Sequence, residues 1–593
     1  MSHAIAFRPL ATARLAAGLV FGGSILAAAS PAIAGGGGGG GGAVYDHRVV
    51  ALSGQSAPGL AAGQWTAFDL PSINASGQIA FHGETDGSFV DYGLWTTKPD
   101  DPQDLRIIIG TDLFPPDAPP GVRYARTELF YVHPMLNDDG SIGFWTHLDG
   151  YPDDPADLRG SIFRFDGTTI EAVAHPGDTV PGIPGATLAW IGNLAGRSAG
   201  GLLTFDARLE GPGITEDNDY VQLVEWFGGL TAVIREGGPA PGMPGVTWSP
   251  IVPFPETHVA SNGRLTFLSE TSDDFLFGAH AIWQGFPGAI EAVVKTGDPL
   301  PNGQPFRRFS FPDRFATNDA GSVVAQLSFG LPDPLGEGLF RFGPGGDEVI
   351  LLDGQPAPFG TWQQVESGFQ MGPDGTVVFI ARLAGVPADA DTGLFRQRPG
   401  QPVELLVREG DQPFGSNPGV EFDDLTVADV TVIDGSGRIH FRANRRGPGM
   451  TPEWHDGVWT IEPDGTVNVV LRGQQAMTVA PFDVRFVHDI RFWSGDGPET
   501  GLPAGVNERG DLALRVGFHD GSEAIVHAWL PPDCPADRDG DGVITFDDLL
   551  IVLGDFGRTG PIGTGGDADW DGDTDFDDLL VILGAFGTAC DPF

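Results

Sequence analysis

One eight-residue motif recurs along the chain and constrains its fold more than any other feature. Its clearest copy is residues 74–81, which read Asn-x-x-Gly-x-x-Ala-Phe. Asn at the first position and Gly at the fourth are typical of a type I turn, in which the Asn side chain bonds the local backbone. The alternation of Ile79 and Phe81 with less apolar residues predicts a half-buried strand directly after the turn.

Related copies of the motif follow along most of the chain. They are Asn137–Phe144, a degenerate copy near Asn193–Phe205, Asn262–Phe267, Asn318–Ala325, Pro373–Phe379, Asp434–Phe441 and Asn507–Leu514. A glycine that ends a second recurring segment gives the period, and it stands at positions 54, 110, 177, 237, 297, 354, 410 and 473. The mean step is about 60 residues, a period that indicates a solenoid, a propeller or an array.

Each repeat contains four strand signals. Besides the strand after the turn, they are a Gly followed by an aliphatic and an aromatic residue (Gly93–Trp95), a β-branched run that ends in a Gly/Pro turn (Val49–Gly59), and an apolar segment such as Trp65–Leu70. Four short antiparallel strands in such a unit form one propeller blade. We therefore predict an all-β fold, a β-propeller of about eight four-stranded blades, with seven as the alternative because the third copy is degenerate.

The two ends of the repeat region predict how a ring would close. The first repeat begins with a strand at Tyr45–Leu52 that has no Gly-aliphatic-aromatic strand before it, and the last repeat ends with an additional strand at Ala524–Leu530. A closed ring forms if these two strands pair. An open solenoid would not need this arrangement.

The N-terminal region is typical of an exported protein. Residues 1–34 combine Arg8 and Arg14 with an apolar run at Leu15–Ala29 and a small-x-small site at Ala32–Ala34, which together predict a signal peptide. The apolar run is shorter than the ~20 residues that span a bilayer, and no later stretch is apolar enough to do so. Residues 35–42 are an unbroken glycine run, which we interpret as a linker before the propeller repeats of residues 43–531.

The charge of the chain excludes two kinds of partner. The formal net charge is −46, which argues against nucleic acid and against an anionic membrane surface. It favours solubility or cation binding. We therefore expect a secreted protein or one held at the extracellular cell surface.

The composition changes at residue 532 to a segment, 532–593, in which Asp dominates the charged residues. Residues 537–548 match a twelve-residue calcium loop, in which carboxylates at positions 1, 3, 5 and 12 and the carbonyl at position 7 supply the oxygen ligands. A second copy is offset by 30 residues. The predicted ligands of two Ca²⁺ ions are Asp537, Asp539, Asp541, Val543 (through its carbonyl) and Asp548, and Asp567, Asp569, Asp571, Asp573 and Asp578.

Each calcium loop leads into a predicted helix. Phe546, Leu549, Leu550 and Leu553 follow one another at helical spacing, and the second copy repeats the pattern. Cys534 and Cys590 lie just outside the duplication. In an oxidising environment they could pair and fasten the ends of this small module.

These features support two resemblances to known families. Residues 533–593 resemble a type I dockerin of the variant flanked by cysteines, a small α-helical module with two EF-hand-type calcium loops. The resemblance implies calcium-dependent binding of a cohesin-like protein on a scaffold or cell surface. Thr574 departs from the aliphatic residue expected at position 8, and Phe546-Asp547 and Phe576-Asp577 occupy the positions that usually read the cohesin.

The repeat region resembles the secreted bacterial tandem-repeat proteins named for Asn-x-x-Gly-x-x-Ala-Phe, whose members end in different anchoring modules. That resemblance implies a propeller and brings no catalytic residues. Our interpretation is an exported, non-catalytic propeller, tethered by the dockerin-like module, whose face binds a glycan or a protein. The alternative is a carbohydrate-active enzyme, a glycoside hydrolase or lyase, with its site in the propeller channel, although no catalytic motif identifies one.

Overall fold

The structure is a computed structural model. It describes residues 45–588 apart from 61, 87–91, 99–100, 112, 117, 126–133, 151–158, 198–200, 227–228, 250–256, 273–278, 310–314, 331–334, 367, 424, 426–430, 452–454, 494–503, 531–533, 540–542, 560–564 and 570–572. The predicted signal peptide and glycine linker lie outside the described residues, as do Asp541, Asp571 and Cys590.

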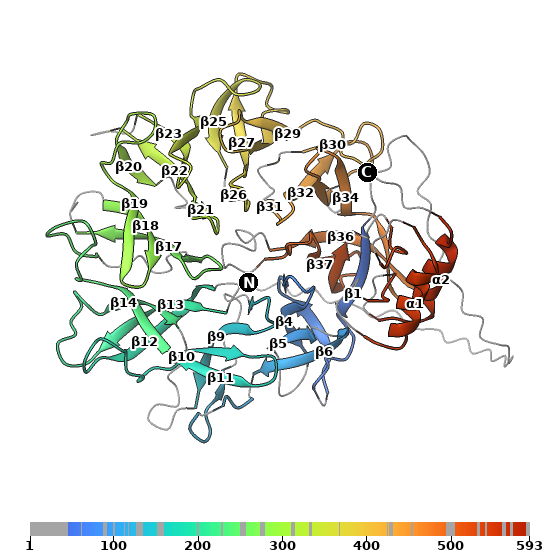
Figure 1. Cartoon of the computed structure of the whole chain (residues 1–593), viewed down its shortest axis with the longest axis horizontal. Coiled ribbons are helices and arrows are strands. Elements are labelled where there is room, and N and C mark those ends of the chain that lie inside the picture. Colours follow the sequence, from blue (N-terminus) through green and yellow to red (C-terminus); the bar gives the residue numbers. More distant parts are fainter. Residues whose placement is uncertain are drawn as a thin grey trace, which may run out of the picture. The chain divides into compact units, whose positions relative to one another are not determined.

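The repeats form eight antiparallel sheets, and each sheet is one propeller blade. Figure 1 shows the sheets following one another around a ring, from the blue strand β4 through green and yellow to the dark orange strand β37. The short strands β21, β26 and β31 are labelled near the middle of this ring. The structure thus confirms the propeller and settles the number of blades at eight.

The first four blades occupy residues 65–295. Their strands are β2 (Trp65–Phe68), β3 (Ser72–Ile73), β4 (Ile79–Thr85), β5 (Tyr92–Lys98) and β6 (Asp101–Gly110) in blade 1; β7 (Arg123–Tyr124), β8 (Met135–Leu136), β9 (Ile142–Asp149), β10 (Arg159–Phe165) and β11 (Ile170–Ala174) in blade 2; β12 (Thr187–Arg197), β13 (Leu203–Glu210), β14 (Tyr220–Trp226) and β15 (Gly229–Arg235) in blade 3; and β16 (Thr257–Val259), β17 (Leu265–Thr271), β18 (Ala279–Phe286) and β19 (Ala289–Lys295) in blade 4.

The last four blades complete the ring. Their strands are β20 (Phe306–Phe309), β21 (Phe315–Thr317), β22 (Val323–Phe329), β23 (Gly336–Phe342) and β24 (Glu348–Leu352) in blade 5; β25 (Thr361–Val365), β26 (Gln370–Met371), β27 (Val377–Ala384), β28 (Thr392–Gln397) and β29 (Glu404–Arg408) in blade 6; β30 (Glu421–Phe422), β31 (Thr431–Ile433), β32 (Ile439–Arg446), β33 (Asp456–Ile461) and β34 (Val467–Arg472) in blade 7; and β35 (Ala476–Ala480), β36 (Asp483–Arg491), β37 (Leu512–Phe518), β38 (Glu523–Trp529) and β1 (Asp46–Leu52) in blade 8.

Blade 8 is built from both ends of the repeat region. Strand β1 pairs antiparallel with β38, with Asp46 opposite Trp529 and Leu52 opposite Ala524. The pairing continues past the strand ends, because the Ser53 N–H donates to the Glu523 carbonyl at 2.8 Å. The predicted closure of the ring is therefore confirmed, and β1 serves as the outermost strand of the last blade.

Neighbouring blades bury apolar side chains against each other all the way around. The repeat region contains eight hydrophobic clusters, and each combines residues of two consecutive blades, including the pair formed by blades 8 and 1. In β4, Ile79 and Phe81 belong to the cluster facing blade 8, whereas Ala80 belongs to the cluster facing blade 2. The prediction of a half-buried strand was therefore wrong, because both faces of a blade are covered by its neighbours.

The two aromatic positions of the repeat are partners across adjacent strands. Phe81 lies opposite Trp95 and Phe441 lies opposite Trp459, with ring centroids 6.5 Å and 5.8 Å apart. The glycine two residues before the second aromatic makes room for its ring. A Cβ atom at Gly457 would lie only 2.3 Å from a carbon of the Trp459 ring. The pattern Gly-aliphatic-aromatic is thus a packing requirement at these blade interfaces.

The Asn of the motif joins blades to each other as well as closing its own turn. The Oδ1 atom of Asn74 accepts hydrogen bonds from the N–H groups of Ser76 (3.1 Å) and Gln78 (2.9 Å). Its Nδ2 donates to the Asn137 carbonyl in the corresponding turn of blade 2 at 2.8 Å. Asn507 of blade 8 donates in the same way to the Asn74 carbonyl at 3.0 Å. The buried amide is therefore fully used, as buried polar groups must be.

Three copies of the motif depart from the predicted alignment. The turn hydrogen bonds place Ala260 and Gly372, not Asn262 and Pro373, at the first position in blades 4 and 6. In blade 3, Asn193 lies within strand β12 and not in a turn. The fourth position holds a glycine with φ between +81° and +87° in the copies that the structure describes, including Gly77, and this left-handed conformation favours glycine.

The segment after the propeller contains two helices, α1 (Phe546–Asp555) and α2 (Phe576–Ala585), as the loop duplication predicts. They pack around a small cluster that contains Ile544, Val552 and Ile582. Among the described residues, no helix has the length and apolar character needed to cross a membrane.

The packing of the second aromatic position predicts the effect of Gly457→Ala. The added Cβ would overlap the Trp459 ring, so the free energy of unfolding should fall by about 1–3 kcal/mol. Gly229→Ala in β15 is the matched control, because its Cβ would meet no heavy atom within 4 Å. Urea unfolding of both variants measures the effect, and equal stability of the two would contradict the packing role of Gly457.

The turn hydrogen bonds predict that Asn74→Ala destabilises the propeller. The substitution leaves the buried N–H of Gln78 without a partner and removes the bond to the Asn137 carbonyl, which keeps only the Gly140 N–H. These losses should lower the free energy of unfolding by about 2–3 kcal/mol. Asn262→Ala, which removes one exposed turn bond to the Arg264 N–H, should cost less than about 1 kcal/mol. The midpoints of urea unfolding test this difference. A loss that is no larger for Asn74→Ala than for Asn262→Ala would refute the role in joining blades.

Candidate calcium-binding loops

Both helices of the C-terminal module begin with a capping box. In α1 the Thr545 hydroxyl accepts from the Asp547 N–H at 3.1 Å, and the Asp548 carboxylate accepts from the Thr545 N–H at 2.7 Å. Asp575 and Asp578 play the same parts in α2. A Ser, Thr or Asp three residues before an acidic residue is the usual sequence signal for such a helix start.

The last aspartate of each loop also holds the beginning of that loop. The Oδ1 atom of Asp548 accepts from the Arg538 N–H at 2.6 Å and from the Asp539 N–H at 3.2 Å. In the second loop, Asp578 accepts from the N–H groups of Ala568 (2.5 Å) and Asp569 (3.0 Å). One buried carboxylate therefore brings the two ends of a twelve-residue loop together, where the first and last metal ligands must meet.

The environment of Asp548 keeps its carboxyl ionised. Burial alone would raise the pKa of Asp548, but hydrogen bonds from the backbone N–H groups of Thr545, Asp539 and Arg538 outweigh burial and hold the pKa below its usual value. A calcium ligand must be deprotonated to bind the metal. Asp548 meets this requirement at neutral pH.

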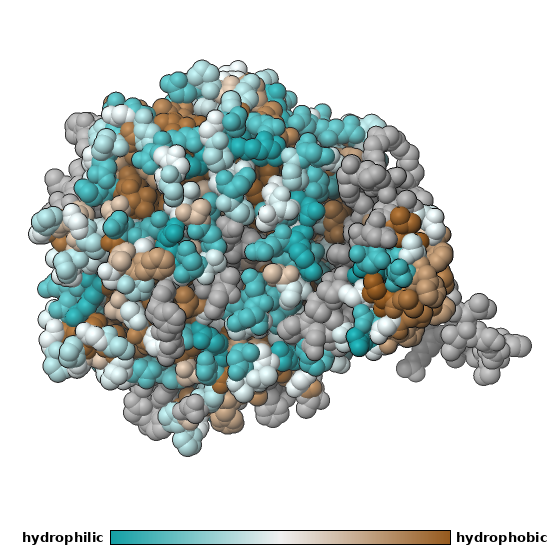
Figure 2. All heavy atoms as spheres, in the orientation of Figure 1, coloured by the Kyte–Doolittle hydropathy of each residue, from teal (hydrophilic) through white to brown (hydrophobic). Residues whose placement is uncertain are grey.

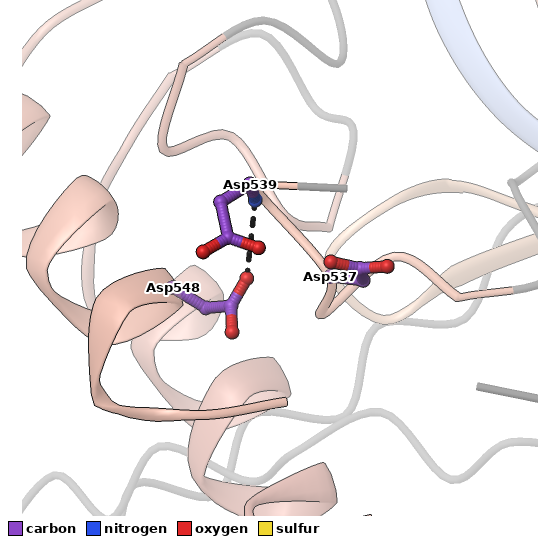
Figure 3. Close-up of side chains that lie close together, drawn as sticks. All are labelled: Asp537, Asp539 and Asp548. Atoms are coloured by element: carbon purple, nitrogen blue, oxygen red, sulfur yellow. Dashed lines mark hydrogen bonds between the residues drawn. The ribbon is translucent and has the colours of Figure 1, made fainter. Parts of the chain in front are cut away.

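The loops gather the predicted ligands as the calcium pattern requires. Carboxylate oxygens of Asp537, Asp539 and Asp548 lie within 4.8 Å of one another, and those of Asp567, Asp569 and Asp578 do the same. Figure 3 shows the carboxylates of Asp539 and Asp548 side by side, joined through the Asp539 N–H, with Asp537 on the neighbouring part of the loop. Oxygen-only donor sets of this kind suit Ca²⁺, which takes six to eight oxygens.

Some predicted ligands are not located by the structure. Asp541 and Asp571, at position 5, lie outside the described residues, so their role stays a prediction. Val543 directly precedes the buried Ile544, and the carbonyl ligation predicted for it likewise stays a prediction. Asp573 is described, and its carboxylate belongs to a third acidic group, in which oxygens of Asp573, Asp575 and Asp578 lie within 4.8 Å of one another.

Asp575 is a candidate ligand that the sequence analysis did not assign. It stands at position 9 of the second loop, a position that often binds the ion through a water molecule. The first loop has Thr545 at this position. The sequence shows this acidic residue at position 9, but the predicted set of five ligands in each loop did not include that position.

Each loop bonds, through its eighth residue, to the segment that follows the helix of the other loop. The Ile544 N–H donates to the carbonyl of Thr588, after α2, and the Thr574 N–H donates to the carbonyl of Arg558, after α1. Thr574 is buried like its counterpart. Its departure from an aliphatic residue therefore leaves the backbone pairing of the second loop unchanged.

The apolar stripe predicted for each helix lies mostly on the surface. Phe546, Leu550 and Leu553 of α1 are about half exposed, and Phe576, Leu580 and Leu583 of α2 match them. Figure 2 shows apolar residues gathered over this pair of helices. The buried side of each helix is formed instead by other residues, such as Val552 and Ile582. The duplication thus presents two similar apolar faces to solvent.

The cysteine prediction is described only in part. Cys534 is disulfide-bonded and packs against the small core of the module. Cys590 lies outside the described residues, so the pairing of Cys534 with Cys590 stays a prediction.

The geometry of the loops predicts the outcome of Asp548→Asn. Removing the charge of the ligand that closes the first loop should reduce the number of bound Ca²⁺ ions from two to about one, measured by calorimetry. Asp578→Asn should have the same effect in the second loop. Asp547→Asn, one residue earlier on the exposed side of α1, is the control and should retain two ions. Full calcium binding by Asp548→Asn would refute the ligand assignment.

Comparison with known proteins concerns the propeller. No curated protein matches the chain. Among solved structures, the β-propeller domain of the Trilobed protease from Pyrococcus furiosus is 9% identical, with 68% of this chain and 98% of that chain covered and a TM-score of 0.34. The WD40 domain of SCAP from fission yeast is also 9% identical, with 82% and 94% covered and a TM-score of 0.34.

A puromycin-hydrolyzing peptidase of Mycobacterium tuberculosis is 12% identical, with 74% of this chain and 60% of that chain covered and a TM-score of 0.31. Likenesses at these scores carry no argument about what this chain does. A family model described as a family of unknown function, DUF7453, matches residues 45–111 and 87–527. This match takes in nearly the whole propeller, and the chain therefore belongs to the DUF7453 family.

Proposed function

We propose that the protein is exported and displays a ligand-binding propeller outside the cell, held there by its C-terminal calcium-loaded module. The observation that carries this proposal is the duplicated unit of acidic loop and helix. Each copy joins a candidate calcium site to an apolar face that the described part of the chain leaves exposed. Exposed apolar faces of this kind mark sites of protein–protein interaction.

The expected partner of this module is a cohesin-like protein on a scaffold or cell surface. Calcium and partner binding are coupled in this proposal, because the ligand Asp548 also caps α1, whose Leu550 and Leu553 would contact the partner. Filling a loop with Ca²⁺ therefore fixes the position of the helix that follows it. The resemblance to type I dockerins supports the same partner class.

Export is supported by the sequence of residues 1–34, which has the three parts of a signal peptide. The strongly negative net charge supports a soluble protein that avoids nucleic acid. The Asn-x-x-Gly-x-x-Ala-Phe resemblance supports the same arrangement, a repeat region followed by an anchoring module.

Binding of the full chain to recombinant type I cohesin modules tests the proposal. At least one module should bind in calcium and dissociate when EGTA removes it. The double variant Leu550→Glu/Leu580→Glu should lose binding by more than about 100-fold, because it places a charge in each apolar face. The propeller variant Leu335→Glu, which changes another exposed leucine, is the control and should bind normally. Failure of every module to bind in calcium would overturn the proposal.

A further inference from the structure

The described part of the propeller contains a cavity that its repeats do not explain. It lies between blades 7 and 8, has a volume of about 450 Å³, and is lined by Arg442, Asp456, His488, Asp489 and Glu523 among others. Its walls come from strands β32 and β33 on one side and β36, β37 and β38 on the other. This volume is within the range of small-molecule sites.

The charged groups around the cavity are matched in pairs. Arg442 donates to both carboxylate oxygens of Asp456, at 3.0 and 2.9 Å, and Arg491 donates to Asp489 at 3.0 Å. Glu523 pairs with Arg515 at 2.5 Å. A charged ligand would have to break one of these ion pairs to find a counter-charge. A neutral ligand that both donates and accepts hydrogen bonds can use the pairs as they are.

The two aspartates are in direct contact, which bears on catalysis. Burial raises the pKa of Asp456. Burial would also raise that of Asp489, but a hydrogen bond from Asp456 and the guanidinium of Arg491 lower it instead. Carboxyls that share a hydrogen bond are closer than the ~5 Å that separates the two carboxyls of a retaining glycosidase, and closer still than those of an inverting one. The Asp456–Asp489 pair therefore has groups for binding a sugar and lacks the spacing of a glycosidase pair.

The cavity has room and an unused donor on its wall. Gly517 has no side chain there. A Cβ atom at this position would lie 3.5 Å from the Asp489 Cβ and 3.9 Å from the backbone N and O atoms of Asp489, which are ordinary contact distances. The Nε–H of Arg442 is buried and has no partner within the described part of the chain. An unpaired buried donor is costly.

An apolar hairpin extends from the same wall. Strand β36 turns back to β35 through Phe482, which is fully exposed and has φ +66°, a conformation unusual for an aromatic residue. Val484 and Phe486 are also more than half exposed on this strand. Arg485 joins the hairpin to the cavity by donating to Ser522 on its wall at 2.6 Å.

We propose that the cavity between blades 7 and 8 binds a sugar unit of a neutral oligosaccharide, and that the β35–β36 hairpin supports further units through Phe486. Sugar hydroxyls donate to carboxylates and accept from guanidinium groups at the same time, which suits the matched pairs. The flat C–H face of a sugar ring packs on exposed aromatic rings. This inference rests on the ligand-binding half of the proposed function and is independent of the calcium module.

Oligosaccharide binding by the full chain tests the inference. An array of neutral glucan, xylan, mannan and galactan fragments, with uronate-containing fragments beside them, identifies the ligand, and calorimetry then measures its affinity. Gly517→Leu fills the cavity without a backbone clash and should weaken binding by about tenfold or more. Phe486→Ala should weaken binding of a hexasaccharide about fivefold and leave a disaccharide unaffected.

Controls separate this result from loss of fold and from failure of the tether. Gly229→Leu changes a glycine with open space around its Cβ position, and Phe114→Ala changes another exposed aromatic residue, both away from the cavity. Both variants should bind as the unchanged protein does. EGTA should not affect sugar binding, even where it abolishes cohesin binding. The inference is overturned if no neutral oligosaccharide binds, if only uronates bind, or if Gly517→Leu binds normally. If the protein hydrolyses the bound sugar and Asp456→Asn abolishes this hydrolysis, the inference is also overturned, because the cavity would then be the site of an enzyme.

Discussion

The pairing of β1 with β38 is the contact on which the rest of the propeller depends. Each blade is apolar on both faces, so a blade at the end of an open row would expose one face to water at a cost of about 25 cal/mol for every Å². The closed sheet of blade 8 places Ala51 of β1 in the same cluster as Trp65 of blade 1. The ring then has no exposed end, and every blade interface is used.

Glu523 connects this closure to the inferred sugar site. Its backbone bonds Ser53, the residue directly after β1, and its carboxylate accepts from the Phe68 N–H of blade 1 at 3.2 Å. The residue also lines the cavity between blades 7 and 8. Strand β38, which pairs with β1 to complete the ring, is therefore also part of the inferred site. Binding at the cavity and closure of the ring should support each other, since both hold Glu523 in one position.

Much of the fold could be predicted because the motif residues each have a local task. The turn needs an acceptor at Asn74 and a left-handed glycine at Gly77, and the blade interface needs Phe81 opposite Trp95. These requirements repeat, so they appear in the sequence as a period. Alignment failed in blades 4 and 6, where Ala260 and Gly372 occupy the first position. In blade 7 the alignment is right although the residue differs. Asp434 there keeps the acceptor role, and Arg438 instead donates to the next blade at 2.7 Å.

The features behind the two proposals were harder to predict because they do not repeat or because they break a rule. Arg442, Asp456 and Asp489 come from three strands and meet only when blades 7 and 8 pack together. The spacing of Phe546 and Leu550 correctly predicted a helix but gave no sign that this stripe faces solvent. Apolar helical stripes usually face a core. Here the core of the module is formed by other apolar side chains, such as those of Ala536 and Val552.

Hydrogen exchange of the segment 46–52 tests the closed ring most directly. If β1 is the outer strand of blade 8, those of its amides that bond to β38 exchange only when the propeller opens, and they should be protected together with those of 523–529. The two peptides should also lose protection at the same urea concentration. Exchange of 46–52 within seconds while 523–529 stays protected would show that the first strand does not close the ring.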